Sequence, residues 1–198
     1  MKKTIILAAT IFMLSSINVK AQKVHFGIKA GMNASSLNYS GNSDMQTKIG
    51  FNAGVLAHIH SHSSQWAVQP ELIYSAEGAK SKANSDASLN LGYLNVPILV
   101  QYMFDNGFRL EAGPQIGFLL NAKSKDNNGS TDVKDGYKST AFSLPVGVGY
   151  LTTSGLGFDA RYAFGLSNIV DNNNGPSVKS NVFQFGIFYQ FSDPKISH

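Results

Sequence analysis

The chain has 198 residues, a length that suits one domain or two small ones. It contains no cysteine, which excludes disulfides, thiolate metal sites and a thiol nucleophile. Only 14% of its residues are charged, against about 25% in a typical soluble domain, while 43% are hydrophobic and 19 are glycine. The formal net charge is +4, and setting aside the three lysines among the first 21 residues leaves +1. A charge this small excludes the basic surface that a nucleic-acid partner requires.

Residues 1–21 have the pattern of a secretory signal peptide. Lys2 and Lys3 precede an apolar run from residue 5 to residue 14, and Val19 and Ala21 stand at the −3 and −1 positions of a cleavage site. The run is shorter than the roughly 20 residues that a membrane-spanning helix needs. We therefore expect an exported chain whose residues 22–198 form a single domain.

Eight segments then alternate apolar and polar residues with a period of two, which predicts strands. They cover residues 24–35, 49–59, 66–77, 89–104, 108–121, 142–150, 156–167 and 183–191. Each is long enough for a tilted strand to cross a bilayer, which takes about 9–11 residues. The even number favours an all-β fold, an eight-stranded antiparallel up-and-down transmembrane β-barrel.

The connectors between these segments alternate in length. The long ones are residues 38–47, 80–88, 124–138 and 170–179, and the short ones are residues 60–64, 105–107 and 152–155. Bacterial barrels have short periplasmic turns and long external loops. The alternation therefore predicts a periplasmic N-terminus and four loops outside the cell, with residues 126–129 and 171–175 as flexible polar loops.

The two faces of the segments differ in a way that favours lipid outside and a filled lumen inside. One face carries large apolar residues such as Phe51, Phe118 and Phe185, and the other carries glycine and small polar residues. Aromatic residues near the strand ends suit the interfacial girdles of such barrels. These residues are Trp66, Tyr102, Phe104, Phe108, Tyr150, Phe158, Tyr189 and Phe191.

The polar face also carries seven charged residues, which we predict to form an ionic network in the lumen. They are Lys29, Glu71, Glu77, Arg109, Glu111, Asp159 and Arg161. An eight-stranded barrel is only wide enough to be filled by side chains, and an isolated buried ion is costly. We therefore expect Arg109 and Arg161 to pair with Glu71, Glu111 and Asp159.

Several stretches resemble the outer-membrane β-barrel domain family common in Bacteroidota, often labelled PorT-like or porin family. They include QPELIYS at residues 69–75, YLNVPIL at 93–99 and LEAGPQIG at 110–117. The resemblance implies a small barrel of the OmpA/OmpX type in a Gram-negative outer membrane, in contact with its lipids and lipopolysaccharide and inserted by the barrel-assembly machinery. It implies no activity. Members often end on an aromatic residue; Phe191 fits that position, although residues 192–198 follow it.

Two groups of residues point only weakly to a chemical function. His58, His60 and His62 alternate on one side of a strand end, a pattern that suits zinc or copper, but the adjacent serines favour a solvated turn. Some eight-stranded barrels are lipid A enzymes with a histidine beside a serine or aspartate at the outer rim, whereas these histidines fall toward the periplasmic end. We therefore predict no enzyme, cofactor or metal site.

The sequence leaves three functions open. The first is a non-enzymatic outer-membrane barrel with a side-chain-filled lumen and a structural role, or a role in binding extracellular partners through its long loops. The second is a small porin-like solute channel. The third is a soluble periplasmic lipocalin-like carrier, with its apolar face turned inward around a ligand.

Overall fold

The computed structural model describes residues 22–39, 45–61, 65–81, 87–127, 129–171 and 177–191. The predicted signal peptide lies outside these ranges, as does most of residues 171–175. The strands are β1 Gln22–Tyr39, β2 Met45–Ser61, β3 Trp66–Ser81, β4 Ser88–Met103, β5 Phe108–Ala112, β6 Gln115–Asp126, β7 Gly129–Asp132, β8 Thr140–Leu151, β9 Leu156–Gly165 and β10 Val178–Gln190. A short 3-10 helix, η1, spans Lys134–Gly136. None of the described residues forms a helix long and apolar enough to cross a membrane.

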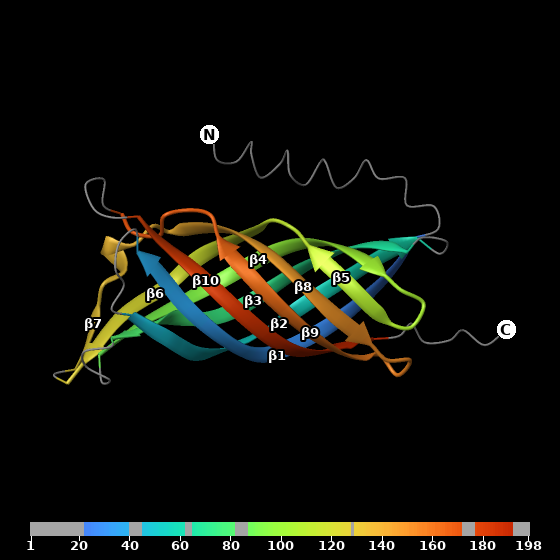
Figure 1. The fold of residues 1–198 in the computed structure, drawn as a ribbon, viewed down its shortest axis with the longest axis horizontal. Coiled ribbons are helices and arrows are strands. Elements are labelled where there is room, and N and C mark those ends of the chain that lie inside the picture. Colours follow the sequence, from blue (N-terminus) through green and yellow to red (C-terminus); the bar gives the residue numbers. More distant parts are fainter. Residues whose placement is uncertain are drawn as a thin grey trace.

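The sheet closes into a ring because the first strand pairs with the last. β1 and β10 run antiparallel in an unbroken register from Gly27 opposite Gln190 to Tyr39 opposite Val178. The other strands pair antiparallel around the ring, and all of them run obliquely along the long axis of the molecule (Figure 1). Closure gives each of the described wall strands a partner on both sides, so none of these strands leaves a sheet edge facing lipid.

β5 and β6 are two halves of one wall strand. Gly113 and Pro114 separate them, and Pro114 has no N–H to donate to the ladder. Its carbonyl oxygen still accepts a hydrogen bond from the N–H of Ile98 at 2.9 Å. The register of the wall strand with β4 and with β8 is the same on both sides of Gly113 and Pro114. With these halves counted once and β7 outside the ring, the described strands confirm the predicted eight-stranded antiparallel barrel.

The apolar face of the wall points outward, as predicted. Phe51, Phe118 and Phe185 are 57%, 41% and 51% exposed, whereas Arg109 and Arg161 are each 2% exposed. The lipocalin-like alternative needs these rings inside, and it is therefore wrong.

Aromatic rings gather near the end of the barrel that carries the short turns. Trp66 and Tyr102 meet edge to face with ring centroids 5.0 Å apart, Tyr102 and Phe104 do so at 5.0 Å, and Phe104 lies 5.7 Å from Phe108. The rings continue along neighbouring strands β3, β4 and β5. Such a row suits the boundary between acyl chains and headgroups.

The predicted long loop at residues 124–138 is largely regular structure. β6 continues to Asp126 and pairs with β7, with Lys123 opposite Asp132, and η1 follows. This hairpin lies at the long-loop end of the barrel (Figure 1). Beyond the bilayer neither face needs to be apolar, so the ladder continues without the alternation that revealed the other strands.

A register shift changes which residues of β6 face inward. The shift lies between Gly92 and Tyr93 of β4, opposite Asn121 and Leu119 of β6. A bulge adds one residue to one strand and reverses the alternation beyond it. Ala122 therefore takes the buried position, and the side chain of Asn121, which the alternation of residues 108–121 places on the polar face, packs over Gly92 instead.

We expect Phe185→Arg to lower the unfolding free energy in lipid vesicles by about 2–4 kcal/mol, because it puts a cation near the middle of the lipid-facing wall. Urea titrations of the refolded protein measure this free energy. The folded fraction at each urea concentration is read from the gel, on which the unheated folded barrel migrates faster. The control is Thr131→Arg, at an exposed position of β7. Equal effects of the two substitutions would contradict a lipid-facing wall.

Candidate functional site in the barrel lumen

The centre of the lumen holds an arginine between two glutamates. Arg161 of β9 places its Nη1 2.7 Å from Oε2 of Glu71 on β3, and its Nη2 2.7 Å from Oε1 of the same residue. Its Nε donates to Oε1 of Glu111 on β5. The guanidinium is planar and presents donors on two sides, which suits one cation held between two carboxylates. The pairing therefore crosses the inside of the barrel.

Neutral amides complete the hydrogen bonding of both glutamates. Nε2 of Gln69 donates to Oε1 of Glu71 at 2.6 Å, and Nε2 of Gln101 donates to Oε2 of Glu111 at 2.7 Å. Buried ion pairs are tolerated only when their remaining lone pairs are satisfied in this way. Neither glutamine was predicted as a site residue. Their positions could have indicated them, because Gln69 lies two residues before Glu71 on the inward face of β3, and Gln101 lies opposite Glu111.

A second ion pair extends the cluster. Nζ of Lys29 lies 2.6 Å from Oδ1 of Asp159, and the same oxygen is 3.6 Å from Nε of Arg161. The structure thus brings together five of the seven predicted lumen residues. We refer to Lys29, Glu71, Glu111, Asp159 and Arg161 as the ionic cluster.

We expected Arg109 to pair with a carboxylate, but among the described residues it makes no salt bridge. Its Nη1 donates to Oε1 of Gln101 at 3.4 Å, and its guanidinium carbon lies 5.0 Å from the ring centroid of Phe188. A cation over an aromatic face gains electrostatic attraction, most of all where water is excluded. Phe188 lies inside the barrel because Gly157 on β9 leaves room for its ring. The alternation of residues 183–191 places Phe188 on the same face as Gln184 and Gln190, but we expected only small polar residues on that face.

Glu77 stands apart from the ionic cluster. Its Oε1 accepts hydrogen bonds from Oγ of Ser75 at 2.9 Å and Nδ2 of Asn95 at 3.1 Å, and its Oε2 accepts one from Oγ of Ser180 at 3.1 Å. All three donors are neutral. Within the described ranges, the carboxylate therefore accepts hydrogen bonds but makes no salt bridge with a cation.

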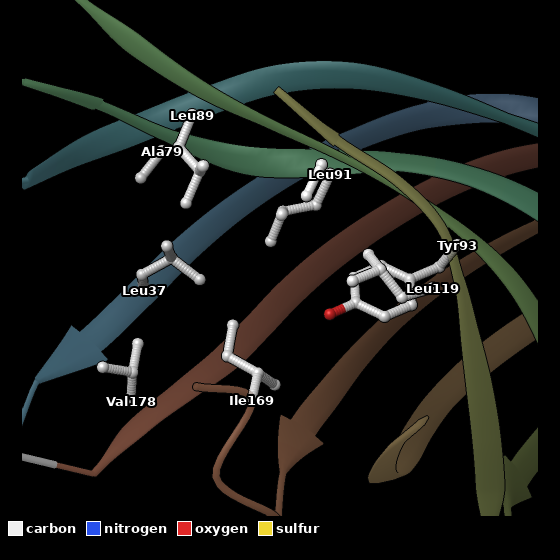
Figure 2. Close-up of a cluster of buried hydrophobic side chains, with 9 residues drawn as sticks. Leu37, Ala79, Leu89, Leu91, Tyr93, Leu119, Ile169 and Val178 are labelled. Carbon is white, nitrogen blue, oxygen red and sulfur yellow. The ribbon is translucent and has the colours of Figure 1, made fainter. Parts of the chain in front are cut away.

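An apolar cluster fills the lumen at the long-loop end, where we predicted only polar residues. We call it the apolar cap. It consists of Leu37, Ala79, Leu89, Leu91, Tyr93, Leu119, Ala122, Ile169 and Val178. Figure 2 shows these side chains extending toward one another from several strands, with Ile169 reaching in from the segment after β9. The inner surface thus changes character along the barrel, from apolar at one end to ionic in the middle.

The histidines lie at the short-turn end of the lumen. The rings of His25 and His60 stack with centroids 5.4 Å apart, and those of His58 and His60 are 5.2 Å apart and tilted. Nδ1 of His58 is 3.3 Å from Oε1 of Gln69. Stacked rings do not direct their nitrogens to one point, and no cluster in the described ranges has the geometry to hold a metal. His62 lies outside those ranges.

Comparison with known proteins agrees with this architecture. Residues 20–171 match the family described as outer membrane protein beta-barrel domain. No curated protein matches the sequence.

Two solved structures share the fold. Neisserial surface protein A is 15% identical, with a TM-score of 0.60, over 84% of this chain and 97% of its own. The attachment invasion locus protein Ail of Yersinia pestis is 17% identical, with a TM-score of 0.52, over 85% of this chain and 99% of its own.

We expect Arg161→Met to cost about 3–5 kcal/mol of unfolding free energy, because it leaves two buried carboxylates without their cation. Replacing the whole group, as in Arg161→Met with Glu71→Gln and Glu111→Gln, should recover most of that loss. Urea titrations in detergent measure both. A loss below about 1 kcal/mol for Arg161→Met would show that the cluster does not stabilise the barrel.

Proposed function

Because this chain belongs to the outer membrane protein β-barrel domain family, we propose that it is a non-enzymatic barrel with a sealed lumen that displays a binding face outside the cell. The protein lies in the outer membrane, among its lipids and lipopolysaccharide. The observation that carries the proposal is the Arg161-centred ionic cluster, which crosses the lumen below the apolar cap.

Two successive layers support a sealed lumen. In the ionic cluster the side chains of Arg161, Glu71 and Glu111 are at most 2% exposed. In the apolar cap, Leu37, Leu91 and Ile169 are equally buried. An ion crossing the barrel would have to break the salt bridges and pass an apolar layer in which nothing replaces its hydration shell. Both barriers oppose the porin-like alternative.

The long-loop end supports the binding role, because two of its loops are joined into one surface. Tyr137 forms a bridge with Val170, Lys138 donates its N–H to the carbonyl oxygen of Ile169 at 2.8 Å, and Asp171 donates to that of Gly136 at 3.0 Å. An ordered surface loses less entropy when it binds a partner. Ail, which shares the fold, has been solved in complex with the heparin analogue sucrose octasulfate, so a barrel of this fold binds a soluble ligand.

The proposal includes neither catalysis nor a cofactor. His25, His58 and His60 lie at the short-turn end, near the connection between β2 and β3, whereas Ser35 and Ser167 lie at the opposite end. A serine nucleophile needs its base within hydrogen-bond reach, and the length of the barrel separates these groups.

Two narrower proposals rest on the residues already quoted. The first is kinship with the PorT-like barrels of Bacteroidota, based on the stretches at residues 69–75, 93–99 and 110–117. The second is insertion by the barrel-assembly machinery through the end of β10, where Phe191 is exposed and its N–H bonds to the carbonyl oxygen of Phe26 at 2.8 Å.

Planar-bilayer recording tests the sealed lumen. We expect the folded protein to give no steady current steps in KCl, because the ionic cluster and the apolar cap block the path. A general porin refolded in the same detergent is the positive control, and heat-unfolded protein is the negative one. Reproducible steps that require the folded barrel would overturn the proposal in favour of a channel.

A further inference from the structure

One acid inside the barrel has no cation in direct contact with its carboxylate among the described residues. The described strands bury three cations, Lys29, Arg109 and Arg161, and four acids, and Lys48 lies half-buried on the inward face of β2. The ionic cluster joins three of those acids to a cation, and the fourth is Glu77. Lys48 is near, but its ammonium donates to the backbone oxygen of Glu77, at 2.9 Å, and not to the carboxylate.

A small cavity lies beside this carboxylate, just below the apolar cap. It measures about 20 Å³, and its lining includes Glu77, Tyr93, Asn95, Ser143 and Ser180. A space of this size holds one water molecule or one small ion. Every residue named here brings an oxygen atom, which is the donor that hard cations prefer.

Gly117 keeps the cavity open. A Cβ at this position would lie 2.5 Å from Oδ1 of Asn95 and 3.3 Å from Cδ1 of Tyr93. Any larger residue would push both side chains into the space beside Glu77. The wall is therefore shaped to leave this volume.

Tyr93 gives a second, independent sign of a ligand. Its side chain is 2% exposed, and its hydroxyl has no hydrogen-bond partner within the described part of the chain. Buried hydroxyls are rarely left in that state, because the lost hydrogen bond costs about 1–3 kcal/mol. The hydroxyl stands at the end of the ring that points into the barrel (Figure 2), and the residue lines the cavity.

We propose that this cavity binds one monovalent cation of the size of sodium, held by the carboxylate of Glu77 and the hydroxyl of Tyr93. A cation here would touch the carboxylate of Glu77, which the ammonium of Lys48 does not, and one positive charge is enough to balance one carboxylate. A water molecule would satisfy Tyr93 but leave that carboxylate without a cation in contact. The inference goes beyond the proposed function, since it concerns neither the binding face nor conductance.

The test is the sodium dependence of folding. The refolded protein is titrated with urea in detergent at fixed pH, while sodium chloride replaces tetramethylammonium chloride at constant ionic strength. An ion that binds only the folded barrel raises the folding constant about tenfold for each tenfold rise in sodium above its dissociation constant. We expect that slope for the wild-type protein.

Two variants identify the ligands. Glu77→Gln keeps the shape of the side chain but removes its charge, so the folding constant should lose its sodium dependence. Tyr93→Phe removes one oxygen, so the same slope should appear only at higher sodium concentrations. If Glu77→Gln fails to fold, the shift of the sodium dependence in Tyr93→Phe still tests the site.

The matched control is Asp105→Asn, which removes an exposed charge at the short turn between β4 and β5. It should keep the wild-type slope. A wild-type folding constant that does not respond to sodium would overturn the proposal and indicate that water or a proton fills the site. An unchanged response in Glu77→Gln would overturn it too, because the sodium would then act elsewhere.

Discussion

The structure depends on one constraint: acyl chains offer no hydrogen bond to a peptide group. A sheet can lie in lipid only if each wall strand has two partners, and the pairing of β1 with β10 meets this requirement. Closure also decides the direction of every side chain. The apolar face turns toward lipid. The side chains of the other face must fill a narrow lumen from which bulk water is excluded.

Charged side chains make up part of the core that fills this lumen. Arg161 satisfies two carboxylates from strands on different sides of the ring, and glycines let the long side chains lie flat against the wall. A Cβ at Gly149 would sit 3.0 Å from Cγ of Arg109, and one at Gly147 would sit 2.7 Å from Cγ of Arg161. A slip of one residue in β9 would turn Arg161 into lipid and leave Glu71 alone inside. The ionic cluster therefore favours one register of the ring.

The two ends of the lumen meet different demands. At the long-loop end, Ile169 enters from the segment after β9 to complete the apolar cap. This cap separates the polar interior from the outside and isolates Glu77 beneath it. Toward the other end, the guanidinium of Arg109 lies over the ring of Phe188, and the histidines follow near the short turns. The buried charges thus lie beneath the apolar cap, where each charge needs a partner.

The barrel, its eight wall strands, the direction of both faces and the charged lumen residues could all be predicted from the amino-acid sequence. This is because alternation with a period of two reports directly on which side of a strand a residue lies. Which charges meet could not be predicted in this way. Arg109 faces Phe188 instead of a carboxylate, Glu77 lies among neutral donors, and a bulge exchanges Asn121 for Ala122. These outcomes depend on the stagger between strands far apart in the chain, and no pattern within a single strand records that stagger.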